Sequence, residues 1–573
     1  MFRSATALSL VLIAGVATAQ DRPATPPPAG ARVADSVPPP GPPPAPTPAE
    51  INARVNAVLP PDQAAMKAHV LFLASDAMRG REAGSPEFDI AAQYVAAQFY
   101  AAGLRPGGDD SGYLQRVPLV TYKLDGDATA GWTPRGGTAQ PLVVGTDWQP
   151  SANPGRTETT VTAPVVFVGY GIDAAQFGQD DYKGVDVRGR IVAVVQGAPA
   201  RFGGEERAFF ASVGTKAAIA ERHGAIGIVT VSTRPAAATP PGAVPRPPRN
   251  RAERMTWAKP DGAGRSDAPG APSLGSLTAA GAAKLFGADW AKVMAVTGDN
   301  PRYPTLRSAG TLTVATRTAF TPGASSNVIG VIPGTDPALK HEVVVLSAHL
   351  DHIGVNATGE GDRINNGALD NALGIASLIE EAKRFTASGT PPKRTIMFLA
   401  VTGEEKGLVG SDWFANHPTV PLADIVADVN LDMPILTYRF EDMIVYGADR
   451  TTLGPVVRRA VESAGVGMSP DPMPEQGIFV RSDHFRFVQK GIPAVFLWPG
   501  QKGPGAAAVA AFMGRCYHRP CDELAQQPIM WDQGVRFVDV NYRIAREVAD
   551  GAARPVWNRG DYFGMLYKGR MAR

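Results

Sequence analysis

Cysteine and histidine are scarce in this chain of 573 residues, and neither sign of charge is in excess. The two cysteines allow at most one disulfide bond, and there are only eight histidines. Because 56 lysines and arginines nearly balance 54 aspartates and glutamates, no charge excess favours a nucleic acid as partner. After the N-terminal segment, no apolar run approaches the roughly 18 to 20 residues of a membrane-spanning helix. The sequence therefore predicts neither nucleic-acid binding nor a membrane span.

The first 50 residues have the composition of an export signal followed by a tether. Residues 1–3 carry a positive charge, residues 5–16 are apolar, and residues 17–19 are small, as at a cleavage site. This pattern predicts a signal peptide over residues 1–19 and an exported protein, either periplasmic or secreted. Residues 20–50 are rich in proline and alanine, which predicts an extended tether without a core of its own.

The rest of the chain is too long for one hydrophobic core, and the pattern of apolar and polar residues along it changes twice. Residues 51–124 and 319–573 alternate strand-like apolar runs with helical patterns, whereas residues 125–318 contain short strands with many glycines and prolines. We therefore expect an α/β domain in two parts with a β-rich insert. Apolar residues at helical spacing predict a helix over Pro86–Leu104. Residues 235–272 predict a long loop.

Acidic and imidazole side chains follow three predicted strands. These are Val343–Ala348 with His349, Asp351 and His352 after it, Thr395–Thr402 with Glu404 and Glu405, and Ile425–Leu431 with Asp432. Asp370 precedes a helical pattern, and His518 lies near the C-terminus. Because ligands of an open α/β sheet gather at the carboxyl ends of its strands, these residues are candidates for one metal site.

Each candidate also has an ordinary structural interpretation. His349 could bond to the backbone, Asp370 could cap a helix, and Glu404–Glu405 could be a solvated turn. Asp432 could cap the residues that follow it. Such groups at five strand or helix ends of one domain nevertheless favour the metal site. A borderline metal needs nitrogen and oxygen donors, and a free carboxylate beside it can act as a base.

The order of these motifs resembles the co-catalytic dizinc aminopeptidases, the family of bacterial leucyl aminopeptidase, aminopeptidases S and Y and glutamate carboxypeptidase. The agreeing motifs are His349-Leu350-Asp351, Asp370-Asn371, Glu404-Glu405, Asn430–Met433, Ser482–His484 and Tyr517–Asp522. The match covers residues 51–124 and 319 to the end. The family often has aspartate at the position of Leu369 and serine at that of Leu373, neither of which is a ligand position.

The resemblance implies two zinc ions. His349 and Asp432 would hold one, Glu405 and His518 the other, and Asp370 would bridge them.

The resemblance also implies roles for the neighbouring residues. Glu404 would be the general base, and Asp351 would orient His349 through its other ring nitrogen. Ser482 would do the same for His518. His352 and His484 would be structural or line the pocket.

By the same resemblance we expect the zinc-exopeptidase fold, an α/β fold with a mixed, mostly parallel sheet flanked by helices. The implied reaction is hydrolysis of a peptide bond next to a free amino terminus. Carboxypeptidases, glutaminyl cyclases and non-catalytic binding proteins use the same scaffold. Retention of Glu404 and all five ligands favours an enzyme, and cyclases generally lack the insert and bind a single zinc. The oligomeric state stays open.

The block 125–318 resembles the protease-associated domain. Its phrases recur in order at Phe167–Gly171, Asp186–Val192 and Lys216–Gly227. The block has no ligand-type cluster, because His223 stands alone, and a lone histidine is usually structural. Since the insert separates two parts of one domain, we expect it to cover the active site partly and to restrict access to short peptides.

Cys516 and Cys521 flank His518. In an exported protein, two cysteines so close together predict a disulfide bond, here one that would clamp the loop presenting a zinc ligand. The alternative is two free thiols, because a short loop can hold the Cα atoms outside the permitted separation.

Overall fold

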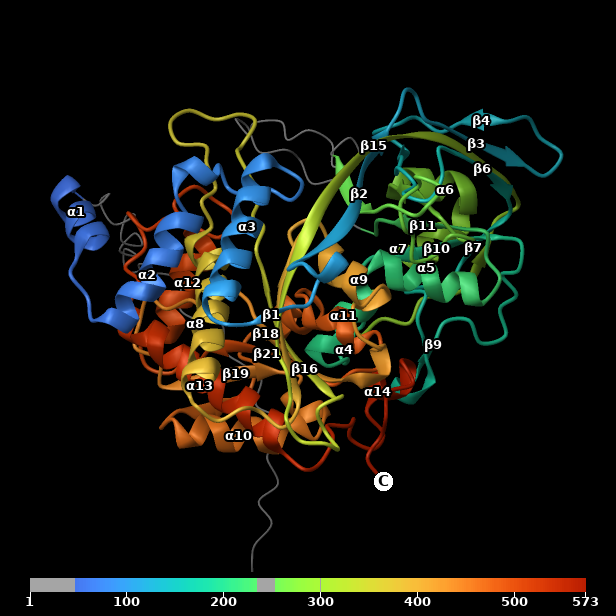
Figure 1. Cartoon of the computed structure of the whole chain (residues 1–573). Coiled ribbons are helices and arrows are strands. Elements are labelled where there is room, and N and C mark those ends of the chain that lie inside the picture. Colours follow the sequence, from blue (N-terminus) through green and yellow to red (C-terminus); the bar gives the residue numbers. More distant parts are fainter. Residues whose placement is uncertain (1–46, 234–252, 299) are drawn as a thin grey trace, which may run out of the picture. The chain divides into compact units, whose positions relative to one another are not determined.

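The computed structural model describes residues 47–233, 253–298 and 300–573, which Figure 1 shows as coloured ribbon. The predicted signal peptide and nearly all of the predicted tether lie outside the described residues. Helix α1 (Pro48–Asn56) begins within the last residues assigned to the tether. A proline in its first turn and a capping box between Thr47 and Glu50 start it there, so the tether prediction is wrong for these residues.

A mixed sheet with a parallel core forms the centre of the α/β part. β16 (Val343–His349) pairs in parallel with β17 (Thr395–Val401) on one side and β18 (Ile425–Leu431) on the other. β18 pairs in parallel with β21 (Ala494–Pro499). Every residue of β16, β18 and β21 is buried, which explains why these strands are mainly apolar in the sequence. The predicted fold class and these predicted strands are confirmed.

Antiparallel strands flank this parallel core. β15 (Gly310–Ile332) pairs with β17, and β19 (Asp442–Tyr446) pairs with β21 and, in parallel, with β20 (Gly467–Ser469). The helices α2 (Pro61–Leu73), α8 (Leu373–Ala387), α10 (Leu453–Ser463) and α13 (Trp531–Asp550) pack on one another, and α8 and α13 also contact β16. None of the helices in the described part of the chain is long and apolar enough to cross a membrane.

Helix α3 (Pro86–Ala101) confirms the helix predicted from the spacing of apolar residues. Phe88, Val95 and Phe99 are fully buried, and the helix packs against β15. Ser85 caps its N-terminus by accepting a hydrogen bond from the Phe88 N–H. Gly103 follows with φ +79°, a left-handed conformation that glycine adopts without strain, and so helps to end the helix.

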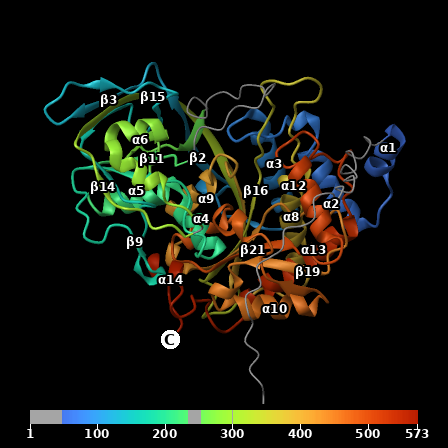
Figure 2. The same cartoon turned by 180° about the vertical axis from the view of Figure 1, so that it is seen from behind.

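The insert has a sheet of its own. Its strand order is β14 (Leu306–Arg307), β7 (Val165–Phe167), β10 (Ile191–Val195), β11 (Gly227–Val231), β13 (Ser273–Leu277) and β5 (Trp148–Gln149). The first half of β15 pairs with β3 (Thr129–Pro134) and β6 (Glu158–Ala163) of the insert, and its later residues pair with β2 (Leu114–Leu124) and β17. One strand therefore crosses the expected boundary at residue 318 without interruption, as Figures 1 and 2 show.

The loop predicted over residues 235–272 is described only from residue 253 onward. Within that part lies β12 (Arg254–Trp257), which pairs antiparallel with β2. The Trp257 indole N–H donates to Asp412 of the α/β part at 2.6 Å. The loop prediction is wrong here because pairing with a distant strand, which local composition does not reveal, decides the conformation.

Candidate metal centre

The predicted site residues gather at the carboxyl ends of the central strands. The chain passes from β16 to β17 on one side and later enters β18 on the other, so β16 lies at a topological switch point, where open α/β sheets bind ligands. His349 is the last residue of β16, Glu404 follows β17, and Asp432 follows β18 directly.

A first group of donors surrounds His349. Its Nε2 lies 3.0 Å from Asp432 Oδ1 and 3.2 Å from Asp370 Oδ1. Its Nδ1 lies 3.1 Å from the backbone oxygen of Asp351. Because a carbonyl only accepts, Nδ1 carries a proton, and Nε2 is the ring nitrogen that faces the two carboxylates, where it binds either a second proton or a metal ion. Three buried donors thus converge on one point.

A second group shares Asp370 with the first. Asp370 Oδ2 lies 3.3 Å from His518 Nε2, and Glu405 Oε2 lies 3.0 Å from the same nitrogen. His352 Nδ1 lies 2.8 Å from Glu405 Oε1. One oxygen of Asp370 therefore faces His349 while the other faces His518.

The donor set fits a borderline divalent metal. Imidazole nitrogens and carboxylate oxygens are ligands that zinc accepts. Although burial acts to raise it, contacts from His349 and His518 hold the pKa of Asp370 well below its usual range. Although burial acts to lower it, Asp370 and Glu405 raise the pKa of His518 to about 10. These carboxylates thus keep their charge and favour a cation at the imidazole nitrogens, whether a proton or a metal ion.

Glu404 lies beside the first group, and its side chain lines one cavity together with His349, Asp370 and Asp432. Burial raises its pKa well above the usual range, with Asp432 and Glu405 adding to the effect and His349 opposing it. A carboxylate with increased proton affinity next to the donor groups has the property that a general base requires.

Asp351 does not hold His349 as expected. Its backbone carbonyl accepts from the imidazole, while its buried carboxylate accepts from the backbone N–H groups of Glu404 at 3.0 Å and Glu405 at 3.3 Å. The side chain therefore positions the turn after β17. It can reach that turn because residues that follow two adjacent parallel strands lie at the same edge of the sheet.

Ser482 also has a different partner from the one expected. Its hydroxyl donates to Asp432 Oδ2 at 2.5 Å and accepts from the Asn430 side-chain amide at 2.6 Å, so it orients Asp432 and not His518. His352, expected to be structural, is a potential donor of the second group. Its position three residues after His349 was the signal that could have identified it. His484 is buried against the rings of Phe479 and Phe496, as a structural histidine would be.

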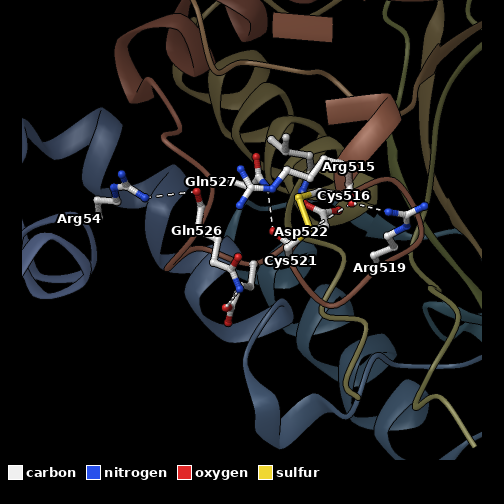
Figure 3. Close-up of a disulfide and its surroundings, with 10 residues drawn as sticks. Arg54, Arg515, Cys516, Arg519, Cys521, Asp522, Gln526 and Gln527 are labelled. Carbon is white, nitrogen blue, oxygen red and sulfur yellow. Dashed lines mark hydrogen bonds between the residues drawn. A yellow bond between two sulfur atoms is a disulfide. The ribbon is translucent and has the colours of Figure 1, made fainter. Parts of the chain in front are cut away.

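The predicted disulfide bond is present. Figure 3 shows the bond between Cys516 and Cys521. Their Cα atoms lie 5.1 Å apart. The Gln527 side-chain amide donates to the Cys521 carbonyl at 2.6 Å. His518 lies inside the closed loop with φ +58°, a left-handed conformation uncommon for histidine. The bond therefore restrains the backbone that presents this donor.

We expect replacement of both cysteines by serine to lower the free energy of unfolding by about 2 kcal/mol, the chain-entropy value for so short a loop. The variant should also bind zinc more weakly, because His518 would lose its restraint. Urea unfolding and zinc titration measure the two effects. Unchanged zinc affinity would show that other contacts hold His518.

Two buried residues that the sequence interpretation did not assign hold the segment carrying Asp370. Asp522 accepts from the backbone N–H groups of Leu369 at 2.9 Å and Asp370 at 3.0 Å. The fully buried guanidinium of Arg81 donates to backbone carbonyls on the other side. Its acceptors are Leu73, Leu350, Asn366, Gly367 and Asp370.

A cavity of about 450 Å³ opens beside these groups. Donors of both groups and Glu404 line it, together with several apolar side chains. The apolar residues are Met433, Met473, Ile478, Phe496, Trp498 and Met513. Among the described residues, all that line this cavity belong to residues 349–518 and none to the insert. The lining therefore gives no support to the expectation that the insert covers the site.

Comparison with protein families shows which family this arrangement resembles. Residues 327–545 match the model of peptidase family M28. This part of the chain is similar to peptidase family M28. The match contains every predicted ligand and Glu404, and it begins within β15, after the insert.

Two individual proteins are similar to parts of this chain. Leupeptin-inactivating enzyme 1 of Streptomyces exfoliatus is 28% identical over 267 residues, which are 44% of this chain and 53% of that protein. A vacuolar membrane protease of Lachancea thermotolerans is 32% identical over 105 residues, 18% of this chain and 10% of that protein. The chain thus spans about half, or much less, of the length of these relatives.

Solved structures were also matched. An aminopeptidase from Aneurinibacillus sp. strain AM-1 has a TM-score of 0.46 at 20% identity, over 87% of this chain and 96% of that one. BSAP, a zinc aminopeptidase from Bacillus subtilis, has a TM-score of 0.42 at 19% identity, over 87% of this chain and 98% of that one.

Proposed function

We propose that this protein is an exported, zinc-dependent aminopeptidase. The observation that carries the proposal is the position of Asp370, whose two carboxylate oxygens face two separate imidazole groups. The M28 match and the name of the Bacillus subtilis protein, a zinc aminopeptidase, support the choice of metal and reaction.

The ligands follow from the contacts. His349 and Asp432 would hold one zinc ion, Glu405 and His518 the other, and Asp370 both, with His352 as a further donor on the second side. When bound, the ions would polarise the peptide carbonyl and make water more acidic. Ser482 keeps Asp432 oriented toward His349, and Asp522 keeps Asp370 between the two groups.

Glu404 would move the proton. Its raised pKa allows the carboxylate to take a proton from the attacking water and later to pass it to the leaving amine. Asp351 holds the turn that aims Glu404 into the cavity through the Glu404 N–H. The apolar lining of the cavity favours a substrate whose N-terminal side chain is apolar, because burying such a side chain is favourable.

A carboxypeptidase is the second candidate, because Arg481 also lines the cavity and could pair with a substrate carboxylate. A panel of aminoacyl and N-blocked peptides separates the two activities. An aminopeptidase should cleave the free peptides and leave the N-blocked ones intact, whereas a carboxypeptidase should cleave both.

We expect exhaustive chelation to abolish turnover and added zinc to restore it, because no other strong electrophile lies among the donors. Metal analysis before and after chelation gives the stoichiometry, for which we expect two zinc ions per chain. Full turnover by protein shown to be free of metal would contradict the proposal.

A further inference from the structure

One wall of the active-site cavity is formed by two short 3₁₀ turns, η9 (Pro474–Gln476) and η10 (Ile478–Val480). Met473, Gln476 and Ile478 of this wall face the cavity. Its back packs against helix α4 (Gly204–Ala211), which belongs to the insert. The wall is therefore enclosed between substrate space and the insert.

The packing between helix and wall leaves no room for additional atoms. A Cβ placed on Gly204 would lie 2.3 Å from the Pro474 carbonyl oxygen, and one placed on Gly477 would lie 2.2 Å from the Ala208 Cβ. Both distances are far below van der Waals contact. At Gly204 the backbone of α4 meets the backbone of the wall directly, and at Gly477 the wall meets the Ala208 methyl group.

A charged cluster fixes the same interface. Arg450 pairs with Glu206 at 2.5 Å, with Asp561 at 2.9 Å and with Glu205. Its guanidinium carbon lies 5.4 Å from the ring centre of Phe479, a residue of η10. The side chain of Arg450 is only 15% exposed, so its contacts are sheltered from water. One cation thus joins the first turn of α4 to the wall.

An aromatic contact extends this interface. The ring centre of Phe209 in α4 lies 5.4 Å from that of Phe563 in α14 (Tyr562–Leu566) and 6.2 Å from that of Phe485 in α11 (His484–Val488). Figures 1 and 2 both show α4 beside α14. Phe485 lies three residues after Ser482, which lines the cavity. Helix α4 therefore contacts the chain both before Ser482, at the wall, and after it, at Phe485.

We propose that helix α4 of the insert sets the position of the wall 473–480 and thereby determines which N-terminal side chains the enzyme accepts. The insert would then act on specificity from behind the cavity, through Gly204, Ala208 and Arg450, and not by covering its entrance. This inference rests on the proposed aminopeptidase activity for its kinetic part only.

The test uses Gly477→Ala in the full-length protein. The added methyl group meets Ala208 and should push the wall into the cavity, so KM for a peptide with an apolar N-terminal residue should rise about tenfold, which corresponds to ~1.4 kcal/mol. The value of kcat and the zinc content should stay within about twofold, because no ligand moves. Adding Ala208→Gly removes the opposing Cβ and should restore KM.

Gly465→Ala is the matched control. Gly465 has φ +68°, close to the φ of +60° at Gly477, but a Cβ there meets nothing within 4 Å. Both variants therefore carry the backbone strain, and only one carries the collision. An equal rise in KM for Gly465→Ala, or no recovery in the double variant, would overturn the proposal.

Amide hydrogen exchange over residues 473–480 supplies a readout that needs no activity. Exchange should be faster in Gly477→Ala and return toward the wild-type rate in the double variant. It should also be faster in Ala208→Gly alone, a substitution that adds no atom to the packed interface. Unchanged exchange in Ala208→Gly would refute the contact. If the wild type cleaves no peptide at all, the aminopeptidase proposal fails, while the exchange rates still test whether α4 positions the wall.

Discussion

Glu404→Gln should reduce kcat by roughly 10² to 10⁴ while zinc content and substrate affinity stay near those of the wild type. The substitution keeps the size and polarity of the side chain but removes the proton acceptor. Glu404 lines the cavity and its pKa is raised well above the usual range by burial, which suits a group that takes up and releases a proton during turnover. Steady-state kinetics and metal analysis of the same preparation measure both quantities.

Glu405→Gln is the matched comparison, because the two glutamates are neighbours with different surroundings. Glu405 contacts His352 and His518, so its replacement should lower the zinc content. A loss of zinc in Glu404→Gln with both ions kept in Glu405→Gln would exchange the two roles. Full activity of both variants would place the catalytic site elsewhere.

Arg81→Met should lower the free energy of unfolding by at least about 3 kcal/mol and weaken zinc binding by about 10- to 100-fold. Arg81 is completely buried and donates to five backbone carbonyls, which the variant would leave without a donor. Several of these carbonyls belong to the segment that carries Asp370. Urea unfolding and competition with a chromogenic chelator measure the two effects.

Arg79→Met is the control for this experiment. Arg79 lies two residues away, but its side chain is 60% exposed and pairs with Glu87 at the surface, so its removal should change stability by less than about 1 kcal/mol. Arg81→Lys keeps the charge but has fewer donors and should lie between the two variants. If Arg81→Met bound zinc as tightly as the wild type, Arg81 would have only a structural role.

The predictable part of the fold rests on local patterns. Strands buried on both faces consist mainly of apolar residues, which is why β16, β18 and β21 could be located from the sequence. The spacing of Phe88, Val95 and Phe99 predicted α3 for the same reason, since a helix buries residues of one face. Strand β12 was missed because its conformation depends on a partner more than a hundred residues away, β2.

The sequence by itself determined where the candidate site residues gather. His349, Glu405 and Asp432 stand at strand ends, and parallel strands bring their carboxyl ends to one edge of the sheet, so their order along the chain already predicted that they meet. The pairing of Cys516 with Cys521 was equally predictable, because no other cysteine exists in the chain.

Only the tertiary structure decided how these donors are held. Asp351 contacts His349 through its carbonyl and the Glu404 turn through its carboxylate, Ser482 orients Asp432, and Arg81 with Asp522 holds the segment of Asp370. The contact of α4 with the cavity wall likewise joins residues that are far apart in the chain. Such contacts depend on side-chain directions and on packing between distant segments, and neither leaves a periodic or spaced signal in the sequence.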